Sequence, residues 1–421
     1  MRILFLSHYF PPEGNAPASR VYEMAKRWVA AGHKVEVITC APNVPNGIIY
    51  DGYRNRFRQT EFMDGISVTR VWTYIAANEG TIRRIMNYIS YMISAVFFAL
   101  FLKKPDVVVA TSPQFFCGWA GVVISRLRRL PFILEIRDLW PDTIVAVGAV
   151  QNQRLLSMIR RLEKWMYASA TRIVTVGEGY KQKLVEKGVP AHKISIITNG
   201  ADLTFFQPRP PNKKLLERFG LNGKIICSYV GTLGLCSGLA VVPKAAKILA
   251  ERKRNELVFL LVGDGATKSA LEQMVRSQNL QNVVFAGRQD KALIPEFLSI
   301  SDVCFAHLQK KDLFKTVLPS KIFEAAAMAK PIILGVEGFA ADLVTQAEAG
   351  VCVESENAEQ LADAFERLAD DVVMRDRLGQ SGRAYVAEHF DRDKLADSYL
   401  RLIASMADPG YAVDVGTQRT V

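Results

Sequence analysis

Short apolar runs alternate with helical stretches along most of this 421-residue chain, and this alternation restricts the fold more than any other feature. The runs are four to six residues long and are bounded by turn residues. Apolar runs of this length, separated by helices, are typical of parallel strands that are buried on both faces. The sequence therefore predicts an α/β protein built on parallel sheets.

The predicted strands fall into two groups. Those of the first half are Arg2–Ser7, Lys34–Thr39, Val68–Trp72, Asp106–Ala110, Phe132–Ile136, Arg172–Val176 and Ile194–Ile197. Those of the second half are Ile225–Val230, Val258–Val262, Val283–Ala286, Val303–Ala306, Pro331–Leu334 and Gly350–Val353. Between the groups, the stretch from Asn199 to Pro211 contains Gly200, Asp202 and three prolines, which is typical of a domain linker.

The length of the chain also favours two domains, because one ordinary core does not grow to this size. We expect a Rossmann-like domain over residues 1–200 and a second one over 201–385. A C-terminal helix, 386–407, is expected to pack back on the first domain. The tail, 408–421, has little to bury and is predicted to be disordered.

Several classes of protein are disfavoured. The six cysteines are scattered with no Cys-x-x-Cys spacing, so we expect free thiols in a reducing cytosol. The apolar run at Met1–Leu6 is too short for a secretory signal. No histidine pair has metal-ligand spacing, and Asp391 and Asp393 precede an amphipathic helix, which favours capping over metal binding. We therefore predict no metal site.

The net charge of +11 is concentrated in one half. Residues 1–200 hold 26 Lys and Arg against 14 Asp and Glu, whereas residues 201–421 hold 27 against 28. The first half is therefore expected to face something anionic. Nucleic acid is disfavoured as that partner, because no basic-aromatic motif or helix-turn-helix signature occurs.

The stretch Ile85–Leu102 is almost entirely apolar and is flanked by basic pairs, Arg83-Arg84 and Lys103-Lys104. Its length reaches the lower limit for spanning a bilayer, but a span would separate two strands of one predicted sheet. We favour a helix that packs on the sheet with an outer face touching anionic lipid, supported by basic residues over 126–129 and 154–164. An ordinary buried helix is the alternative.

The segment from Pro319 to Glu324 carries the chemistry of a nucleotide site. Pro319 suits a first helical turn, and Ser320 and Lys321 lie beside backbone N–H groups that can hold a phosphate. Glu324 follows about one turn later, where a carboxylate could accept hydrogen bonds from two ribose hydroxyls. A capped surface helix is the alternative interpretation of this segment.

Other candidate binding residues follow predicted strands, where ligands bind in doubly wound sheets. Gly14 precedes a helix and permits close approach to a phosphate, and Gly231-Thr232 opens a glycine-containing loop that could cradle a phosphate. Gly263 opens a third loop, which could form one wall of a nucleoside pocket. Arg288 follows the strand Val283–Ala286, where the backbone could bind a base edge. Each of these loops could also be a plain turn.

Taken together, these motifs resemble glycosyltransferase family 4 on the two-domain GT-B fold, over nearly all of residues 1–405. The motifs that carry the likeness are Phe10–Gly14, Ile136–Asp142, Asn199–Asp202, Val230–Thr232, Val262–Gly265 and Leu318–Glu324. The versions at Arg137–Asp142 and Pro319–Glu324 resemble those of bacterial N-acetyl-L-fucosaminyltransferase-like enzymes that build surface polysaccharide such as O-antigen or capsule.

The resemblance implies two Rossmann-like domains facing a cleft and a retaining transfer of a sugar from a UDP-sugar, without a cofactor or a metal. The implied acceptor is a polyprenyl-diphosphate-linked sugar at the cytoplasmic face of the cell membrane. By this likeness Glu324 holds the ribose, Lys321 and Ser320 face the diphosphate, and Arg288 lies at the base. Gly14 would line the cleft from the first domain, and Asp138 would lie on the acceptor side beside Arg137.

Two departures from the family pattern bear on this assignment. Thr316 stands where many members carry an acid that holds the donor sugar, and the usual Arg and Lys of the glycine loop are missing near Leu235 and Ser237. Lys315 or Lys321 could compensate. A UDP-sugar 2-epimerase on the same fold and an inactive polysaccharide-assembly scaffold are the alternative functions.

Overall fold

The computed structural model describes residues 1–44, 47–76, 81–112, 115–140 and 152–407, and these form two compact units. The first unit contains Met1–Thr198 and the chain from Asp393 onwards, and the second contains Asn199–Arg392. The predicted disordered tail, 408–421, lies outside the described residues.

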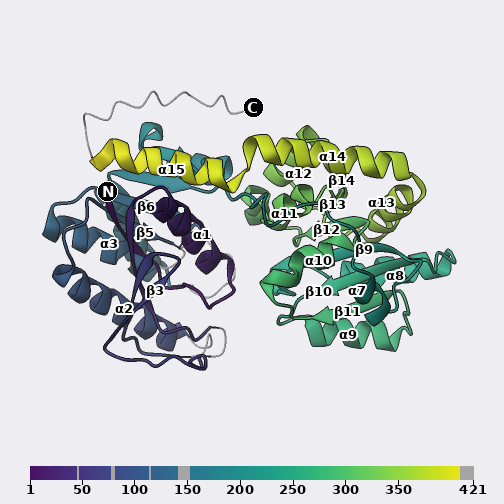
Figure 1. The fold of residues 1–421 in the computed structure, drawn as a ribbon, viewed down its shortest axis with the longest axis horizontal. Helices are drawn as coiled ribbons and strands as arrows, with labels where there is room; N and C mark the ends of the chain where they lie inside the picture. Colours follow the sequence, from purple (N-terminus) through teal and green to yellow (C-terminus); the bar gives the residue numbers. More distant parts are fainter. Residues whose placement is uncertain (45–46, 77–80, 113–114, 141–151, 408–421) are drawn as a thin grey trace. The chain divides into compact units, whose positions relative to one another are not determined.

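The first unit is built on an eight-stranded sheet in the order β3-β4-β2-β1-β5-β6-β7-β8 (Figure 1). Every neighbouring pair is parallel except β3 and β4, which are antiparallel. The strands are β1 (Arg2–Leu6), β2 (Lys34–Cys40), β3 (Arg58–Met63), β4 (Ile66–Val71), β5 (Val107–Thr111), β6 (Phe132–Ile136), β7 (Arg172–Thr175) and β8 (Ile194–Ile196). The predicted parallel sheet is thus confirmed, with one antiparallel edge strand that sequence analysis missed.

The missed strand has no apolar run. The side chains of β3, Arg58–Met63, alternate between exposed and half-buried, as expected for an edge strand that is covered on one face. By contrast, β5 and β6 are buried along their whole length, which produces the continuous apolar runs seen in the sequence.

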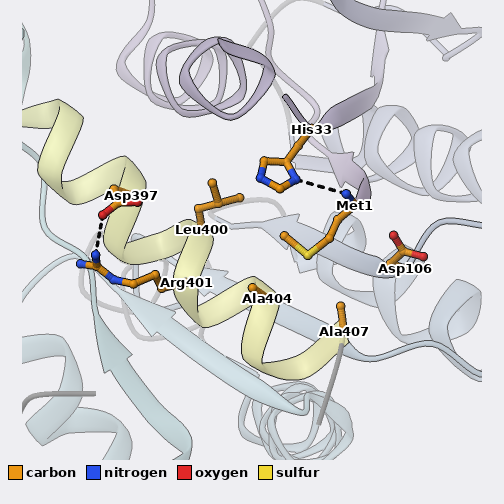
Figure 2. A pocket seen from close by; sticks show the side chains of 8 residues that line it. All are labelled: Met1, His33, Asp106, Asp397, Leu400, Arg401, Ala404 and Ala407. Atoms are coloured by element: carbon orange, nitrogen blue, oxygen red, sulfur yellow. Dashed lines mark hydrogen bonds and ion pairs between the residues drawn. The ribbon is translucent and has the colours of Figure 1, made fainter. Parts of the chain in front are cut away.

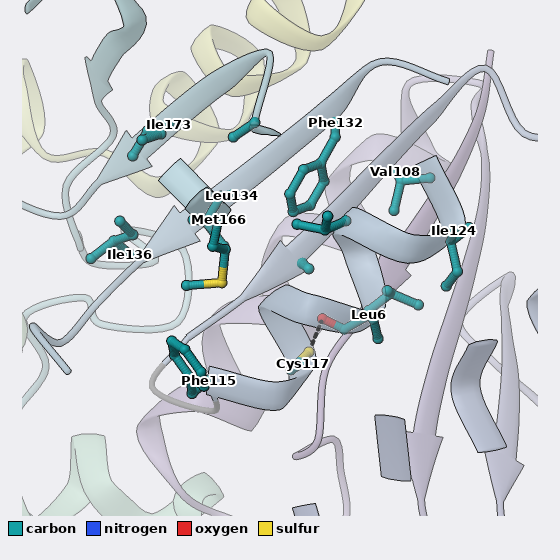
Figure 3. Close-up of a cluster of buried hydrophobic side chains, with 14 of the residues drawn as sticks. Leu6, Val108, Phe115, Cys117, Ile124, Phe132, Leu134, Ile136, Met166 and Ile173 are labelled. Carbon is teal, nitrogen blue, oxygen red and sulfur yellow. Dashed lines mark hydrogen bonds between the residues drawn. The ribbon is translucent and has the colours of Figure 1, made fainter. Parts of the chain in front are cut away.

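Helices cover both faces of the first sheet. They are α1 (Ala16–Ala30), α2 (Thr81–Phe101), α3 (Phe115–Arg128), α5 (Gln153–Ser169), α6 (Glu178–Glu186) and α15 (Arg392–Ala407), with the short 3-10 helix η1 (Ala191–Lys193) before β8. Figure 3 shows the core beneath α3, where Phe132 and Leu134 of the sheet meet Ile124 and Phe115 of the helix. Here α3 lies very close to the sheet, because a Cβ atom on Gly121 would fall 2.4 Å from the Phe132 ring.

The last helix, α15, completes the opposite face of the first unit. Tyr399 of α15 is fully buried and meets Trp28 of α1 edge-on, with ring centroids 5.2 Å apart. The Trp28 indole N–H also donates to the Ala396 carbonyl at 3.0 Å. The segment 386–407, expected as one C-terminal helix, therefore comprises the end of α14 and the whole of α15.

An open hollow lies beside α15, at the amino ends of the strands (Figure 2). The Met1 ammonium lies 3.2 Å from His33 Nδ1, and Leu400 and Ala404 line the helical side. In doubly wound sheets ligands bind at the carboxyl ends of strands, so this hollow lies at the wrong edge of the sheet for a substrate site.

The second unit is a six-stranded parallel sheet in the order β11-β10-β9-β12-β13-β14. Its strands are β9 (Ile225–Val230), β10 (Leu257–Val262), β11 (Val283–Gly287), β12 (Val303–His307), β13 (Ile332–Gly335) and β14 (Gly350–Cys352). Numbered along the chain this is the order 3-2-1-4-5-6, the arrangement of a Rossmann fold. All six strands were predicted to within one or two residues at each end.

The helices of the second unit lie on both faces of this sheet (Figure 1). They are α7 (Lys213–Arg218), α8 (Val241–Glu251), α9 (Lys268–Ser277), α10 (Ile294–Ser299), α11 (Lys321–Ala327), α12 (Phe339–Gln346), α13 (Ala358–Asp370) and α14 (Val372–His389), with the 3-10 helices η2 (Leu235–Ser237), η3 (Lys291–Leu293) and η4 (Asp312–Thr316).

Candidate functional site

The switch point of the second sheet lies between β9 and β12, because the strand order runs outward in opposite directions from this pair. Gly231 and Thr232 follow β9, Gly263 follows β10, and Arg288 follows β11. The fold therefore brings these four predicted residues to one edge of one sheet, at the ends of three adjacent strands. Arg288 is exposed and lies farthest from the switch point.

The glycines of these loops allow a very close approach of two backbones. Gly263 has φ of 146°, and a Cβ atom on it would fall 1.9 Å from the Gly231 carbonyl oxygen. Hydrogen bonds of 2.9 Å join the Gly231 N–H to the Val262 carbonyl and the Gly263 N–H to the Gly287 carbonyl. The three strand ends are therefore tied together through backbone groups, with space that only glycine can fill.

Lys321, at the start of α11, reaches the first of these glycines. Its ammonium lies 3.6 Å from the centroid of the Tyr229 ring, and a Cβ atom on Gly231 would be 3.2 Å from Lys321 Nζ. Among the described residues, no carboxylate forms an ion pair with this ammonium. Lys321 therefore presents a positive charge at the glycine loop, held there by a cation–π contact.

The start of α11 offers fewer backbone donors than the sequence suggested. The N–H groups of Ile322 and Phe323 donate to the carbonyls of Pro319 and Ser320, both at 3.1 Å. Tight turns of this kind use up N–H groups that would otherwise be available at a helix start. Ser320 is half-buried and makes no capping bond through its hydroxyl. Any anion held here would depend more on the Lys321 ammonium than on helix amides.

Glu324 is half-buried rather than exposed on a surface helix as its sequence position suggested. It lines one hollow with Lys321, beneath the ends of β9 and β12. Burial raises the pKa of Glu324, while the positive charges of Arg392, Lys291 and Lys321 oppose that shift. Among the described residues, none donates a hydrogen bond to this carboxylate. Its oxygens are therefore available to accept hydrogen bonds from a ligand.

Thr316, which departs from the family pattern, and Lys315, which could compensate for the missing basic pair, both have local partners. The Thr316 hydroxyl donates to the Leu313 carbonyl at 3.0 Å, within η4. Lys315 pairs with Asp312 at 2.8 Å and with Glu337 at 3.6 Å. Of the two lysines that could compensate for the missing basic pair, Lys321 is thus the one without a carboxylate partner.

His307, which was not among the predicted site residues, holds the glycine loop after β9 in place by a hydrogen bond. It ends β12 and is buried, and its Nε2 accepts a hydrogen bond from the Glu356 N–H at 2.8 Å. Nδ1 therefore carries the proton and donates to the Ser237 carbonyl at 2.7 Å. Burial lowers the pKa of His307, which keeps the ring neutral. In the sequence, the position of His307 directly after a predicted strand was the only signal that could have indicated it.

The predicted residues of the first unit lie at the carboxyl edge of its sheet. Gly14 is exposed in the loop between β1 and α1, and Asp138 follows β6 and is half-buried. The buried Glu13, another residue missed from the sequence, accepts hydrogen bonds from the N–H groups of Asn43 (2.9 Å) and Val44 (3.2 Å). This carboxylate ties the loop after β1 to the loop after β2. The end of the Ile136–Asp142 motif, from residue 141, lies outside the described residues.

No cluster of three or more potential metal ligands occurs among the residues that the structure describes. Asp391 and Asp393 lie on either side of the point where the chain passes from the second unit back to the first. Asp391 forms a parallel bridge with Ala201, and Asp393 pairs with Arg27. Asp391 and Asp393 thus each have a contact within their own unit.

Comparison with known families identifies the class of protein. Residues 15–200 match the glycosyl transferase 4-like domain, and residues 212–385 match the glycosyl transferases group 1 family. The chain therefore belongs to the group 1 glycosyltransferases, family 4, and is an enzyme of the EC 2.4 class.

Relatives agree with this assignment, one of them over nearly the full length of the chain. A protein of Escherichia coli strain K12, named as a putative colanic acid biosynthesis glycosyl transferase, is 25% identical over 415 residues, covering 95% of this chain and 99% of the relative. The capsular polysaccharide biosynthesis glycosyltransferase CapM of Staphylococcus aureus is 23% identical over 299 residues, covering 68% and 73%.

Solved structures confirm the predicted GT-B fold. Anabaena HepE in complex with UDP and glucose superposes with a TM-score of 0.72 at 16% identity, covering 96% of this chain and 99% of that one. WaaG, a glycosyltransferase involved in lipopolysaccharide biosynthesis, superposes with a TM-score of 0.69 at 14% identity, covering 95% and 99%. At these identities the likeness concerns the fold alone.

The close approach of Gly263 to Gly231 can be tested by substitution. Gly263→Ala should lower the free energy of unfolding of the second unit by about 2–4 kcal/mol, because the new methyl group overlaps a carbonyl oxygen and the backbone has positive φ. Gly234→Ala, in the neighbouring loop after β9, is the matched control, since its Cβ atom would meet only Thr232 Cγ2 at 3.8 Å. Differential scanning calorimetry of both variants measures the effect, and equal melting temperatures would contradict it.

Proposed function

We propose that this glycosyltransferase transfers a sugar from a UDP-sugar to a lipid-linked glycan acceptor, with retention of anomeric configuration. The proposed donor sugar is an N-acetylated amino sugar, and the proposed setting is the assembly of bacterial O-antigen or capsule. The resemblance of the Arg137–Asp142 and Pro319–Glu324 motifs to N-acetyl-L-fucosaminyltransferase-like enzymes supports this choice of sugar. The names of the colanic acid and capsule relatives are consistent with it.

One observation carries the nucleotide part of the proposal. The Lys321 ammonium forms no ion pair, and the Glu324 carboxylate accepts no hydrogen bond, among the residues that the structure describes. The two side chains lie one helical turn apart and line the same hollow at the switch point. A nucleoside diphosphate carries the complementary pair of groups, an anionic diphosphate and a ribose diol. HepE, which shares the fold, has been crystallised with UDP and with UDP-glucose.

The proposed chemistry depends on charge that develops on the leaving group. As the bond to the sugar breaks, negative charge gathers on the diphosphate, and the Lys321 ammonium stabilises it where it forms. Because the Tyr229 ring already holds this ammonium, little reorganisation accompanies the step. A phosphate oxygen of the leaving group can accept the proton of the acceptor hydroxyl on the same face. Such a mechanism needs no pair of carboxylates of the hydrolase type.

The proposed contact of Lys321 with the diphosphate can be tested by substitution. Lys321→Met should weaken UDP binding by about 10- to 100-fold, as expected for the loss of a charge-assisted contact. Lys315→Met is the matched control, because Lys315 lies nearby in the chain but pairs with Asp312 and Glu337. Isothermal titration of UDP into both variants distinguishes them. If both lysines matter equally, the assignment of Lys321 is wrong.

The proposed contact of Glu324 with the ribose can be tested with a modified nucleotide. Wild type should bind UDP at least about tenfold more tightly than 2′,3′-dideoxy-UDP, because Glu324 accepts hydrogen bonds from the two hydroxyls. Glu324→Gln, which preserves the shape of this half-buried side chain, should largely remove that preference. The comparison of two ligands and two proteins isolates the contact from general effects on stability. Undiminished discrimination in the variant would refute the role of Glu324.

We also propose that the first unit contacts the anionic face of the cytoplasmic membrane. One helix among the described residues, over Arg83–Phe101, is long and apolar enough to span a bilayer, yet α2 connects β4 with β5 in a single sheet. A crossover helix of this kind is better suited to lying along the surface. Its outer face is strongly apolar, with Ile93 60%, Phe97 46% and Phe101 70% exposed.

Charge surrounds this apolar face of α2. Arg83 and Arg84 precede it and Lys103 and Lys104 follow it, and all four are exposed. Such a combination favours the headgroup region of anionic bilayers. The basic segment at 126–129 contributes less than its sequence implied, because Arg128 is half-buried and donates to the Ala99 and Leu102 carbonyls at the end of α2.

Vesicle binding tests this surface. The double variant Ile93→Asp and Phe97→Asp should bind phosphatidylglycerol vesicles at least about tenfold more weakly than wild type, because two apolar contacts are replaced by charges that anionic lipid repels. Val373→Asp on α14, a residue 79% exposed in the second unit, is the control. Co-sedimentation provides the measurement, and equal binding of all three proteins would rule this face out.

A further inference from the structure

Arg137 is a half-buried residue at the carboxyl edge of the first sheet. It follows β6 directly, and its backbone N–H donates to the hydroxyl of Ser112, which follows the neighbouring strand β5, at 3.2 Å. Sequence analysis placed this residue beside Asp138, on the proposed acceptor side, without giving it a role of its own.

Two nitrogen atoms of the Arg137 guanidinium have no partner among the residues that the structure describes. Its Nε and Nη1 atoms are buried and form no hydrogen bond with any described residue. Burial lowers the pKa of Arg137 to about 10, which leaves the group charged at neutral pH. Buried N–H groups without acceptors are costly to a protein, so such groups are expected where a ligand supplies the acceptors.

Glu135, the acid whose charge acts on Arg137, already has another cation. One carboxylate oxygen of Glu135 accepts from Arg20 Nε at 3.3 Å and from the Thr111 hydroxyl at 3.0 Å. Arg20 in turn donates to the carbonyls of Ile197 and Thr198, both at 2.7 Å. The second oxygen, Oε2, is buried without a partner, and no ion pair joins Glu135 to Arg137. Glu135 attracts Arg137 at longer range, which partly opposes the lowering of its pKa.

The start of α6 lies at the same edge of the sheet as Arg137 and Asp138. Strand register pairs Ile136 with Thr175, so Arg137 lies at the strand end next to the start of α6. The cap of α6, Gly177, makes no side-chain capping bond, and helix starts favour negative charge. One acid, Glu178, lies in this first turn, and its Oε1 atom is 3.7 Å from Lys181.

Tyr180 of α6 is close to both charged groups of the proposed acceptor side. Burial raises the pKa of Tyr180, the negative charge of Asp138 raises it further, and the positive charge of Arg137 opposes them. The phenol therefore stays protonated and can donate a hydrogen bond. Arg137, Asp138 and Tyr180 together combine a cation, a carboxylate and a hydroxyl within one sheet edge.

We propose that Arg137 binds a phosphoryl group of the acceptor, next to the sugar hydroxyl that is glycosylated. The planar guanidinium matches two phosphate oxygens at once, and the basic excess of residues 1–200 would draw such an acceptor to this unit. This inference rests on the proposed function. A phosphoryl group could also come from the donor diphosphate, and the two sources affect different kinetic constants.

Steady-state kinetics with two acceptors separates these sources. One acceptor is a polyprenyl-diphosphate-linked N-acetylhexosamine, and the other is the neutral octyl glycoside of the same sugar. Arg137→Met should raise KM for the diphosphate acceptor by about 10- to 100-fold and leave KM for the octyl glycoside and for the UDP-sugar unchanged. Arg137→Lys, which keeps the charge but not the fork, should fall between wild type and Arg137→Met.

Two results would overturn the inference. A rise in KM for the UDP-sugar alone would assign Arg137 to the donor, and equal rises for both acceptors would make it a structural residue. Arg172→Met is the control for net charge, because Arg172 lies in the same sheet at the opposite end of β7. All five tryptophans of the chain lie in the first unit, so their fluorescence reports whether each variant keeps that unit folded.

A binding experiment keeps this inference separate from the proposed function. Geranyl diphosphate, titrated with tryptophan fluorescence as readout, probes the site without turnover. If wild type binds it and Arg137→Met binds it at least about tenfold more weakly, Arg137 recognises the phosphoryl group even where no UDP-sugar is turned over. Equal binding by both proteins would overturn the inference, whatever the donor proves to be.

Discussion

Parallel hydrogen bonding between strands is the constraint on which the rest of this structure depends. A parallel sheet needs a crossover for every strand, so helices bury both of its faces and all carboxyl ends meet at one edge. In the second unit this brings Gly231, Gly263 and Lys321 together from separate connections. In the first unit it brings Ser112 beside Arg137 in the same way. The candidate sites are thus consequences of strand direction.

Much of the fold could be predicted from the sequence, because strands buried on both faces leave continuous apolar runs, as in β5 and β10. The edge strand β3 left none, since only one of its faces is covered. The residue types of the proposed nucleotide site could also be recognised in the sequence of Pro319–Glu324. The geometry of that site could not, because the contact of Lys321 with Tyr229 joins segments that are distant in the chain. Nor could the sequence show that Glu324 is half-buried.

Buried polar side chains were the hardest residues to interpret in advance. Glu13, Glu135 and His307 resemble ordinary loop or surface residues in the sequence, yet each is buried and joins separate segments of its unit. Buried polar groups are usually hydrogen-bonded, and the bonds that these three residues make hold the segments at the strand ends in place. The precision of both candidate sites depends on these residues as much as on those that would meet a substrate.

The return of the chain to the first unit affects how the protein is made. Trp28 and Ala396, joined by a hydrogen bond, are 368 residues apart in the chain. At about 5–20 residues per second, the ribosome needs roughly 20–70 s to synthesise the stretch between them. During that time the surface of α1 that α15 will cover remains open to water, while the second unit is continuous and can fold on its own sequence. The first unit to begin synthesis is therefore the last to be completed.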